Sequence, residues 1–95
     1  MESHDRAEEH ALAERATLDD QAFTELYNRY FTEMYGFVFK RLGRREVVED
    51  IVSDVFLKVC SHIGDFSPEA GSFRSWIYRI ATNTIIDHTR KASVR

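Results

Sequence analysis

The sequence predicts an all-α fold, a compact bundle of three to four helices with a loop before the last helix. Apolar residues recur three and four positions apart, and no stretch shows the sustained alternation that a half-buried strand needs. The 95 residues contain only one proline and four glycines, so few positions interrupt a helix. With 43% apolar residues, the chain has the size and composition of one small domain.

The first 18 residues form an acidic segment that we expect to be frayed or helical. Residues 1–25 carry eight acids and two bases, whereas residues 26–95 have a net charge of +3. The segment is rich in Ala, Glu and Arg, but its apolar residues are few and small. We therefore place the folded domain at residues 19–95. The opposite charges also suggest the hypothesis that the acidic start shields the basic end in the free protein.

The first long helix is expected to begin at Asp19 or Asp20 and to end at Gly43. Either aspartate can accept hydrogen bonds from the first turn, and its charge is favourable at the positive end of the helix dipole. A glycine after the last apolar residue is typical of a helix C-terminus, and Gly36 suggests a bend between two helices. The apolar stripe comprises Phe23, Leu26, Tyr27, Tyr30, Phe31, Met34, Phe37, Val38 and Leu42.

The next helix is expected at about Arg45 to His62, followed by a loop and a last helix. Glycine and proline predict turns in the loop GDFSPEAGS, and Ser72 is a suitable N-cap for the helix after it. Each of these two helices has an apolar stripe: Val48, Ile51, Val52, Val55, Phe56, Val59 and Ile63 in the first, and Phe73, Trp76, Ile77, Ile80, Ala81, Thr84 and Ile85 in the second. Cys60 lies beside the first stripe and is predicted to be a small core residue.

The composition argues against several classes of function. One cysteine excludes an internal disulfide, and four scattered histidines give no metal-site spacing, so we expect no metal and no cofactor. Asp50 and Asp54 share a helix face, but no third ligand or nucleophile accompanies them, so we predict no catalytic residue and no enzyme. The start MESHDRAEEH is acidic where a secretory signal is basic, and no apolar run approaches the ~20 residues of a membrane span. We therefore expect a reduced, cytoplasmic protein without a membrane partner.

One face of the helix at about Arg45 to His62 lies outside its buried stripe. It carries Asp50, Ser53, Asp54 and Leu57 at helical spacing. Carboxylates around an exposed leucine can dock a basic partner helix, because the charges set the orientation and the leucine supplies buried area. The alternative is an ordinary solvated face, since single exposed leucines are common.

The last helix carries a basic and amide-bearing row outside its buried stripe. Arginines can hold phosphates, and the amide of Asn83 can both donate to and accept from a base edge. Phe66 in the preceding loop could take an unstacked base against its ring. The alternatives are a solvated helix with intrahelical ion pairs and, for Phe66, core packing. The DNA-binding candidates are Phe66, Arg74, Arg79, Asn83, Ile86, Arg90 and Lys91.

Three segments in this order resemble the region 2 domain of extracytoplasmic-function (ECF) sigma factors of bacterial RNA polymerase. They are AFTELYNRY, VVEDIVSDVFLKV and DFSPEAGSFRSWIYRIATNTIIDHTRK, and the resemblance covers about Asp19 to Lys91. It implies a helical domain that binds core RNA polymerase and recognises and melts the promoter minus-ten element. It also implies an anti-sigma factor as a further partner.

The resemblance assigns the two rows to two partners. It implies that Asp50, Ser53, Asp54 and Leu57 contact the coiled coil of the beta-prime subunit. The loop from Gly64 to Ser72 corresponds to the segment that captures a flipped base of the non-template strand. Asn83 matches the position used for base recognition, with Arg79 and Ile86 on the same face and Arg90 and Lys91 suited to phosphate. The alternative function is a sigma-like helical module that binds a regulator or polymerase without reading DNA.

Overall fold

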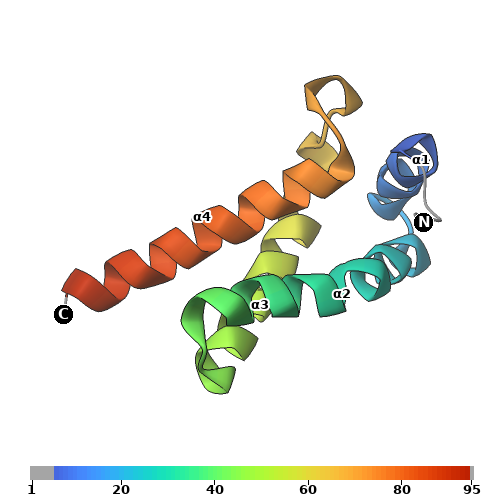
Figure 1. Cartoon of the computed structure of the whole chain (residues 1–95). Coiled ribbons are helices and arrows are strands. Elements are labelled where there is room, and N and C mark those ends of the chain that lie inside the picture. Colours follow the sequence, from blue (N-terminus) through green and yellow to red (C-terminus); the bar gives the residue numbers. More distant parts are fainter. Residues whose placement is uncertain (1–5, 95) are drawn as a thin grey trace.

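The computed structural model describes residues 6–94 of the chain. These residues form helices and no strands, so the predicted all-α bundle is confirmed (Figure 1). Two short 3-10 turns lie in the predicted loop before the last helix. The elements are α1 (Arg6–Ala16), α2 (Asp20–Leu42), α3 (Arg45–His62), η1 (Ile63–Asp65), η2 (Pro68–Ala70) and α4 (Phe73–Val94).

Local sequence signals set both ends of α2. The side chain of Asp19 accepts a hydrogen bond of 2.9 Å from the backbone N–H of Gln21 and caps the first turn. At the other end, Gly43 adopts a left-handed φ of 71°, and its N–H donates to the carbonyl of Phe39 at 2.8 Å. Both predicted ends are therefore confirmed. The bend suggested at Gly36 is wrong, because α2 continues through this position as one helix of 23 residues.

The core lies between α2, α3 and α4, with α3 in contact with both of the other helices (Figure 1). Burial of apolar side chains on all three helices supplies the main driving force for folding. Thr84 is the polar exception in this region, since it is fully buried and donates its hydroxyl proton to the carbonyl of Ile80 at 2.7 Å. The apolar side chains with at most 1% exposure on these helices include Met34, Val38, Val48, Ile51, Val55, Val59, Ile77 and Ala81.

The acidic start of the chain contains a helix that packs on the bundle. Of the two alternatives for residues 1–18, the structure has a helix at α1, while residues 1–5 lie outside the described part. Leu12 and Ala13 are each 1% exposed and belong to the same buried cluster as the core of the other helices. The helix therefore contributes to the core although its composition is mostly polar.

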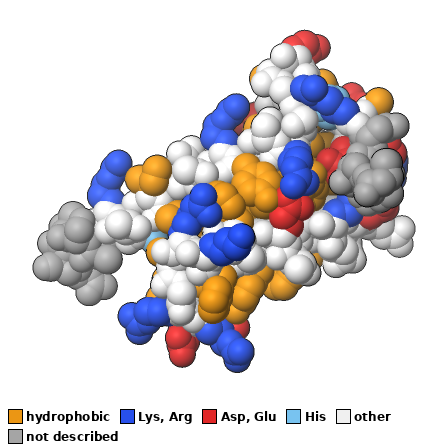
Figure 2. Space-filling model, in the orientation of Figure 1, with side chains coloured by type: hydrophobic (Ala, Val, Ile, Leu, Met, Phe, Trp, Pro, Cys, Tyr) orange, Lys and Arg blue, Asp and Glu red, His pale blue; other side chains and the backbone are white. Residues whose placement is uncertain are grey.

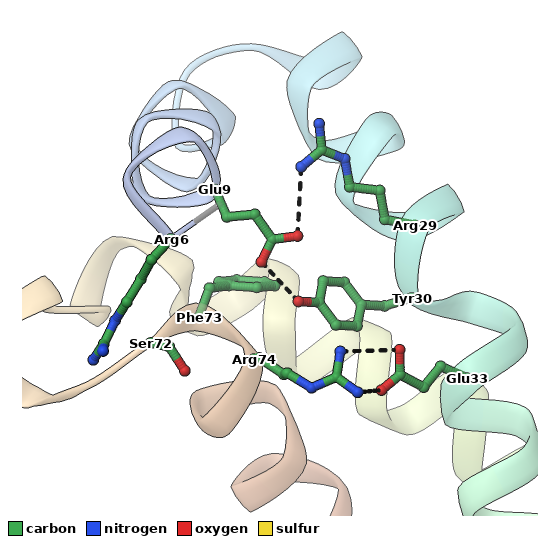
Figure 3. A pocket seen from close by; sticks show the side chains of 8 residues that line it. All are labelled: Arg6, Glu9, Arg29, Tyr30, Glu33, Ser72, Phe73 and Arg74. Carbon is green, nitrogen blue, oxygen red and sulfur yellow. Dashed lines mark hydrogen bonds and ion pairs between the residues drawn. The ribbon is translucent and has the colours of Figure 1, made fainter. Parts of the chain in front are cut away.

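Arg29 of α2 joins α1 to the bundle through carboxylates. Its guanidinium pairs with Glu8 at 2.7 Å, with Glu9 at 3.4 Å and with Glu25 of its own helix at 2.8 Å. The hydroxyl of Tyr30 donates to the buried Glu9 carboxylate at 2.7 Å (Figure 3). Figure 1 places α1 near the start of α4, at the opposite end from its C-terminus. The hypothesis that the acidic start shields the basic end therefore finds no support in Glu8 and Glu9, because these acids face α2.

A second polar cluster joins α2 to the first turns of α4. Glu33 pairs with the guanidinium of Arg74 (Figure 3) and accepts a hydrogen bond of 2.5 Å from the hydroxyl of Tyr78. Burial, together with this hydrogen bond, raises the pKa of Tyr78 to about 12. A cavity of about 600 Å³ lies between the two clusters. Arg29 and Arg74 in its lining are already paired with carboxylates, so their charge is largely compensated.

Leu12→Ala should destabilise the protein if α1 is part of the cooperative fold. Removing a fully buried leucine costs about 2–5 kcal/mol, because transfer energy is lost and a cavity remains. Leu18→Ala is the matched control, since Leu18 is 95% exposed and should change stability by less than about 0.5 kcal/mol. Urea unfolding followed by circular dichroism measures both. Equal effects of the two substitutions would mean that α1 is not packed as described.

Tyr78 should make stability depend on alkaline pH. Its pKa is raised from 10.0 to about 12 in the folded state, so its contribution to stability is complete below pH 10 and is lost as the pH rises toward 12. Tyr78→Phe should therefore flatten the fall in stability across this window. The control is Tyr35→Phe, which removes a hydroxyl without a hydrogen-bond partner among the described residues. An unchanged slope in Tyr78→Phe, measured by urea unfolding at several pH values, would contradict the assigned hydrogen bond.

Candidate functional site

The loop before α4 holds its shape through short-range contacts. The N–H of Phe66 donates to the carbonyl of Ile63 at 3.2 Å, within the turn that closes α3. Gly71 adopts a φ of 136°, a conformation that glycine tolerates far better than other residues. The hydroxyl of Ser72 accepts a hydrogen bond of 3.1 Å from the N–H of Ser75, which confirms Ser72 as the cap of α4. These contacts fix the position at which α4 begins.

Phe66 lies in an aromatic cluster that joins this loop to two helices. Its ring centroid is 5.3 Å from that of His10 on α1, 5.7 Å from Phe73 and 5.5 Å from Trp76 on α4. The side chain is half-buried, and the space beside it measures only about 10 Å³. The base contact suggested for Phe66 from the sequence stays a prediction, since its ring already contacts three others in this structure.

A larger hollow lies on the other side of Trp76, between the end of α3 and the middle of α4. Its volume is about 350 Å³, at the lower end of the range of about 300–1,000 Å³ that is typical of small-ligand sites. The amide of Asn83, the candidate base reader, lines this hollow and is exposed to solvent. The lining residues are Lys58, His62, Asp65, Trp76, Ile80 and Asn83.

Lys58 is held at this hollow by two contacts across the helix pair. Its ammonium donates to the hydroxyl of Thr84 at 3.1 Å and pairs with the carboxylate of Asp87 at 3.5 Å. Lys58, His62 and Asp65 are not among the site residues predicted from the sequence. The sequence does show that Lys58 is a basic residue at the edge of the apolar stripe of α3. Its position opposite Asn83, however, depends on how α3 packs against α4.

The candidate residues on α4 fall into two groups. Arg79, Asn83, Ile86, Arg90 and Lys91 are exposed and lie at helical spacing along α4. Figure 2 shows basic side chains along the course of α4, separated by white and orange ones. Arg74 is also exposed, but Glu33 neutralises its guanidinium, as described above. Of these candidates Asn83 lines the hollow, the other exposed ones lie along the same helix, and Arg74 lies in a separate cluster.

The candidate row on α3 is partly tied to α4. Asp50 and Ser53 are exposed, and Leu57 is 63% exposed, as a docking surface requires. The carboxylate of Asp54 is 2.9 Å from Nε2 of His88 on α4, so this residue is half-buried and already has a partner. Three of the four residues thus present unobstructed side chains on one helix.

An apolar groove of about 520 Å³ runs beside this row, between α2 and α3. Tyr27 and Phe31 line it from α2, and each is 37% exposed although the sequence places both in the buried stripe. Ser53 and Leu57 line it from α3. The prediction that Cys60 is a core residue is wrong, because Cys60 is exposed on the wall of this groove. Figure 2 shows hydrophobic side chains exposed along α2.

Residues 6–94 provide no cluster of three or more His, Cys, Asp or Glu side chains that could bind a metal ion. No helix within the same residues is long and apolar enough to cross a membrane. The described residues present three candidate features for binding a partner: the hollow at Asn83, the exposed row of α4, and the row and groove of α3 and α2.

Comparison with known proteins places the chain in a family. The family model for Sigma-70 region 2 matches residues 26–95. The ECF RNA polymerase sigma factor BldN of Streptomyces coelicolor is 33% identical over 85 residues, which are 88% of this chain and 32% of BldN. The ECF RNA polymerase sigma factor SigW of Bacillus subtilis is 34% identical over 73 residues, 77% of this chain and 38% of SigW. The chain thus spans about a third of the length of these relatives. It belongs to the Sigma-70 region 2 family, as the region 2 domain of an ECF RNA polymerase sigma factor.

Proposed function

We propose that this domain binds core RNA polymerase and recognises and melts the promoter minus-ten element, with one base of the non-template strand held in the hollow at Asn83. The observation that carries the proposal is the position of Asn83 on the wall of a hollow that also contains Trp76 and Lys58. Membership of the family supports the partner and the nucleic acid. The geometry supports the place where the base is held.

The lining of the hollow suits a nucleobase that has left the duplex. An amide can donate to and accept from a base edge, an indole can stack on a base, and an ammonium can reach a base carbonyl or a phosphate. Leaving the stack costs about 1.4 kcal/mol per base step, so contacts to the extruded base offset part of the cost of melting. Asn83 provides the reading group and Trp76 the apolar wall. The ion pair with Asp87 keeps Lys58 in place before the strand arrives.

The exposed residues of α4 supply a track for the strand that leads away from the hollow. Arg79, Arg90 and Lys91 can contact phosphates, and Ile86 is 45% exposed between them as an apolar contact for a base or sugar. Phosphate contacts fix the register of the strand and make binding depend on salt. In this arrangement Arg74 holds the start of α4 against Glu33 and does not belong to the track.

Core polymerase is assigned to the surface of α3. Asp50, Ser53 and Leu57 remain exposed for a partner helix, with the coiled coil of the beta-prime subunit as the partner that the family resemblance implies. Asp54 belongs to the same surface, and its bond to His88 links that surface to α4. The adjoining groove offers apolar area to a partner at the edge of the charged row.

The alternative function is a sigma-like module that binds polymerase or a regulator such as an anti-sigma factor without reading DNA. The observation that favours it is the groove between α2 and α3, because exposed Tyr27 and Phe31 can bury area against a protein without any nucleic acid. The two functions differ in one respect that can be measured. Only the proposed function predicts a base preference that depends on Asn83.

Asn83→Ala should weaken binding of a fluorescent non-template minus-ten oligonucleotide and relax its base preference. The loss of one base contact costs about 1–3 kcal/mol, which is roughly 5- to 150-fold in affinity. Asn28→Ala is the matched control, because Asn28 is an exposed asparagine on α2, away from the residues that line the hollow. An equal loss on scrambled oligonucleotides, or no loss at all, would refute base reading by Asn83 and favour the alternative function.

Leu57→Ala should lower the affinity for core RNA polymerase by more than about 1 kcal/mol, or about fivefold, if its side chain is buried by the partner. Leu18→Ala is the control, since Leu18 is also an exposed leucine but lies outside the row. Fluorescence anisotropy of labelled protein titrated with core polymerase measures both variants. The substitution of Leu57 suits this test better than one of Asp54, whose loss would also free His88. Unchanged affinity in Leu57→Ala would remove the α3 row from the interface.

A further inference from the structure

A chain of ring contacts runs from α1 to the wall of the hollow at Asn83. The ring of His10 meets Phe66 edge to face, with centroids 5.3 Å apart and planes at 62°. Phe66 contacts Trp76 at 5.5 Å, and Trp76 lines the hollow. Asp65, the residue before Phe66, also lines the hollow, and α1 packs against the η1 turn that contains it. The α1 helix therefore touches the structure that supports two walls of the candidate base site.

We infer that α1 is a clasp that fixes the loop beside the hollow, and that His10 is a positioning residue for base capture. His10 acts through Phe66 and not by touching the nucleic acid. The identity of the captured group rests on the proposed function, whereas the clasp itself rests on contacts within the protein. The segment that contains His10 has no role in the site predicted from the sequence.

The loop has few anchors besides the ring contacts of Phe66, and His10 provides the one of these that comes from α1. The backbone hydrogen bonds of the loop join residues three apart, as in the bonds from Phe66 to Ile63 at 3.2 Å and from Gly71 to Pro68 at 3.3 Å. Most side chains between Gly64 and Ala70 are exposed. Phe66 is the one aromatic side chain in that stretch of sequence. Segments with few buried contacts open locally at a low free energy, so the packing of Phe66 decides how well this loop is ordered.

The attachment of α1 to the bundle also rests on residues other than His10. Leu12 and Ala13 are buried in the core, and Glu8 and Glu9 pair with Arg29 of α2. These contacts are made by neighbouring positions on the same short helix. A substitution at His10 can therefore release the loop while α1 remains docked, which allows the clasp to be tested without unfolding the domain.

The imidazole of His10 is an imperfect partner for Phe66. Its Nε2 atom is buried and has no hydrogen-bond partner among the described residues. Such an atom loses its hydration without compensation. His10→Phe keeps a ring in this position and removes the unsatisfied nitrogen. His10→Phe should therefore hold the loop at least as well as the natural residue does, whereas His10→Ala should release it.

Hydrogen exchange of the loop amides, measured by NMR on the whole 95-residue chain, tests the clasp directly. In His10→Ala, the amides of Phe66 and Gly71 should exchange about 2- to 12-fold faster, the range expected for the loss of one aromatic pair. In His10→Phe they should exchange no faster than in the natural protein. Glu14→Ala, an exposed position on the same helix, is the control and should leave these amides unchanged. Unchanged exchange in His10→Ala would overturn the inference.

Binding of the minus-ten oligonucleotide tests the consequence for the site. His10→Ala should bind it about 2- to 12-fold more weakly, because the free loop must be ordered on binding, while its affinity for core polymerase stays unchanged. His10→Phe should restore the natural affinity. Tighter binding by His10→Ala would overturn the inference, since α1 would then obstruct the site. If the natural protein shows no preference for the minus-ten sequence, the proposed function fails, and the exchange experiment still decides whether the clasp exists.

Discussion

The contact between α3 and α4 is the interaction on which both candidate surfaces depend. Their apolar stripes are buried against each other and against α2, and polar contacts run along the same seam. Asp54 meets His88 at 2.9 Å, and Lys58 meets Thr84 at 3.1 Å. This packing turns the amide of Asn83 toward the end of α3, where a hollow forms, and leaves Leu57 on the outside. A change in the crossing of these two helices would alter both surfaces at once.

The features that the sequence predicted well are those that local chemistry determines. The caps at Asp19 and Ser72 and the left-handed Gly43 need only their neighbours in the chain, and all three occur where the sequence places them. Exposure within a stripe depends on the partner helix and was predicted less well. Phe31 belongs to a predicted apolar stripe and Cys60 lies beside one, yet both face the groove because no element covers that side of the described bundle.

The candidate site was harder to predict because it combines residues that are far apart in sequence. Asn83 could be identified from its residue type and its helix face. Lys58 and Asp65 join it only through the packing of α3 and the path of the loop. The ion pairs of Arg29 with Glu8 and Glu9 bridge about 20 residues, so no local pattern shows that α1 docks on α2. These ion pairs also explain how a chain with a net negative charge presents a basic face on α4, because Arg29 neutralises acids of α1 far from the end of α4.

We expect one base of a melted strand to occupy the hollow between α3 and α4. Intermolecular nuclear Overhauser effects between the domain and a non-template minus-ten oligonucleotide would detect this base. The indole protons of Trp76 and the side-chain amide protons of Asn83 should show cross-peaks to protons of the same base. Cross-peaks confined to the basic residues at the end of α4, with none at Trp76 or Asn83, would contradict it.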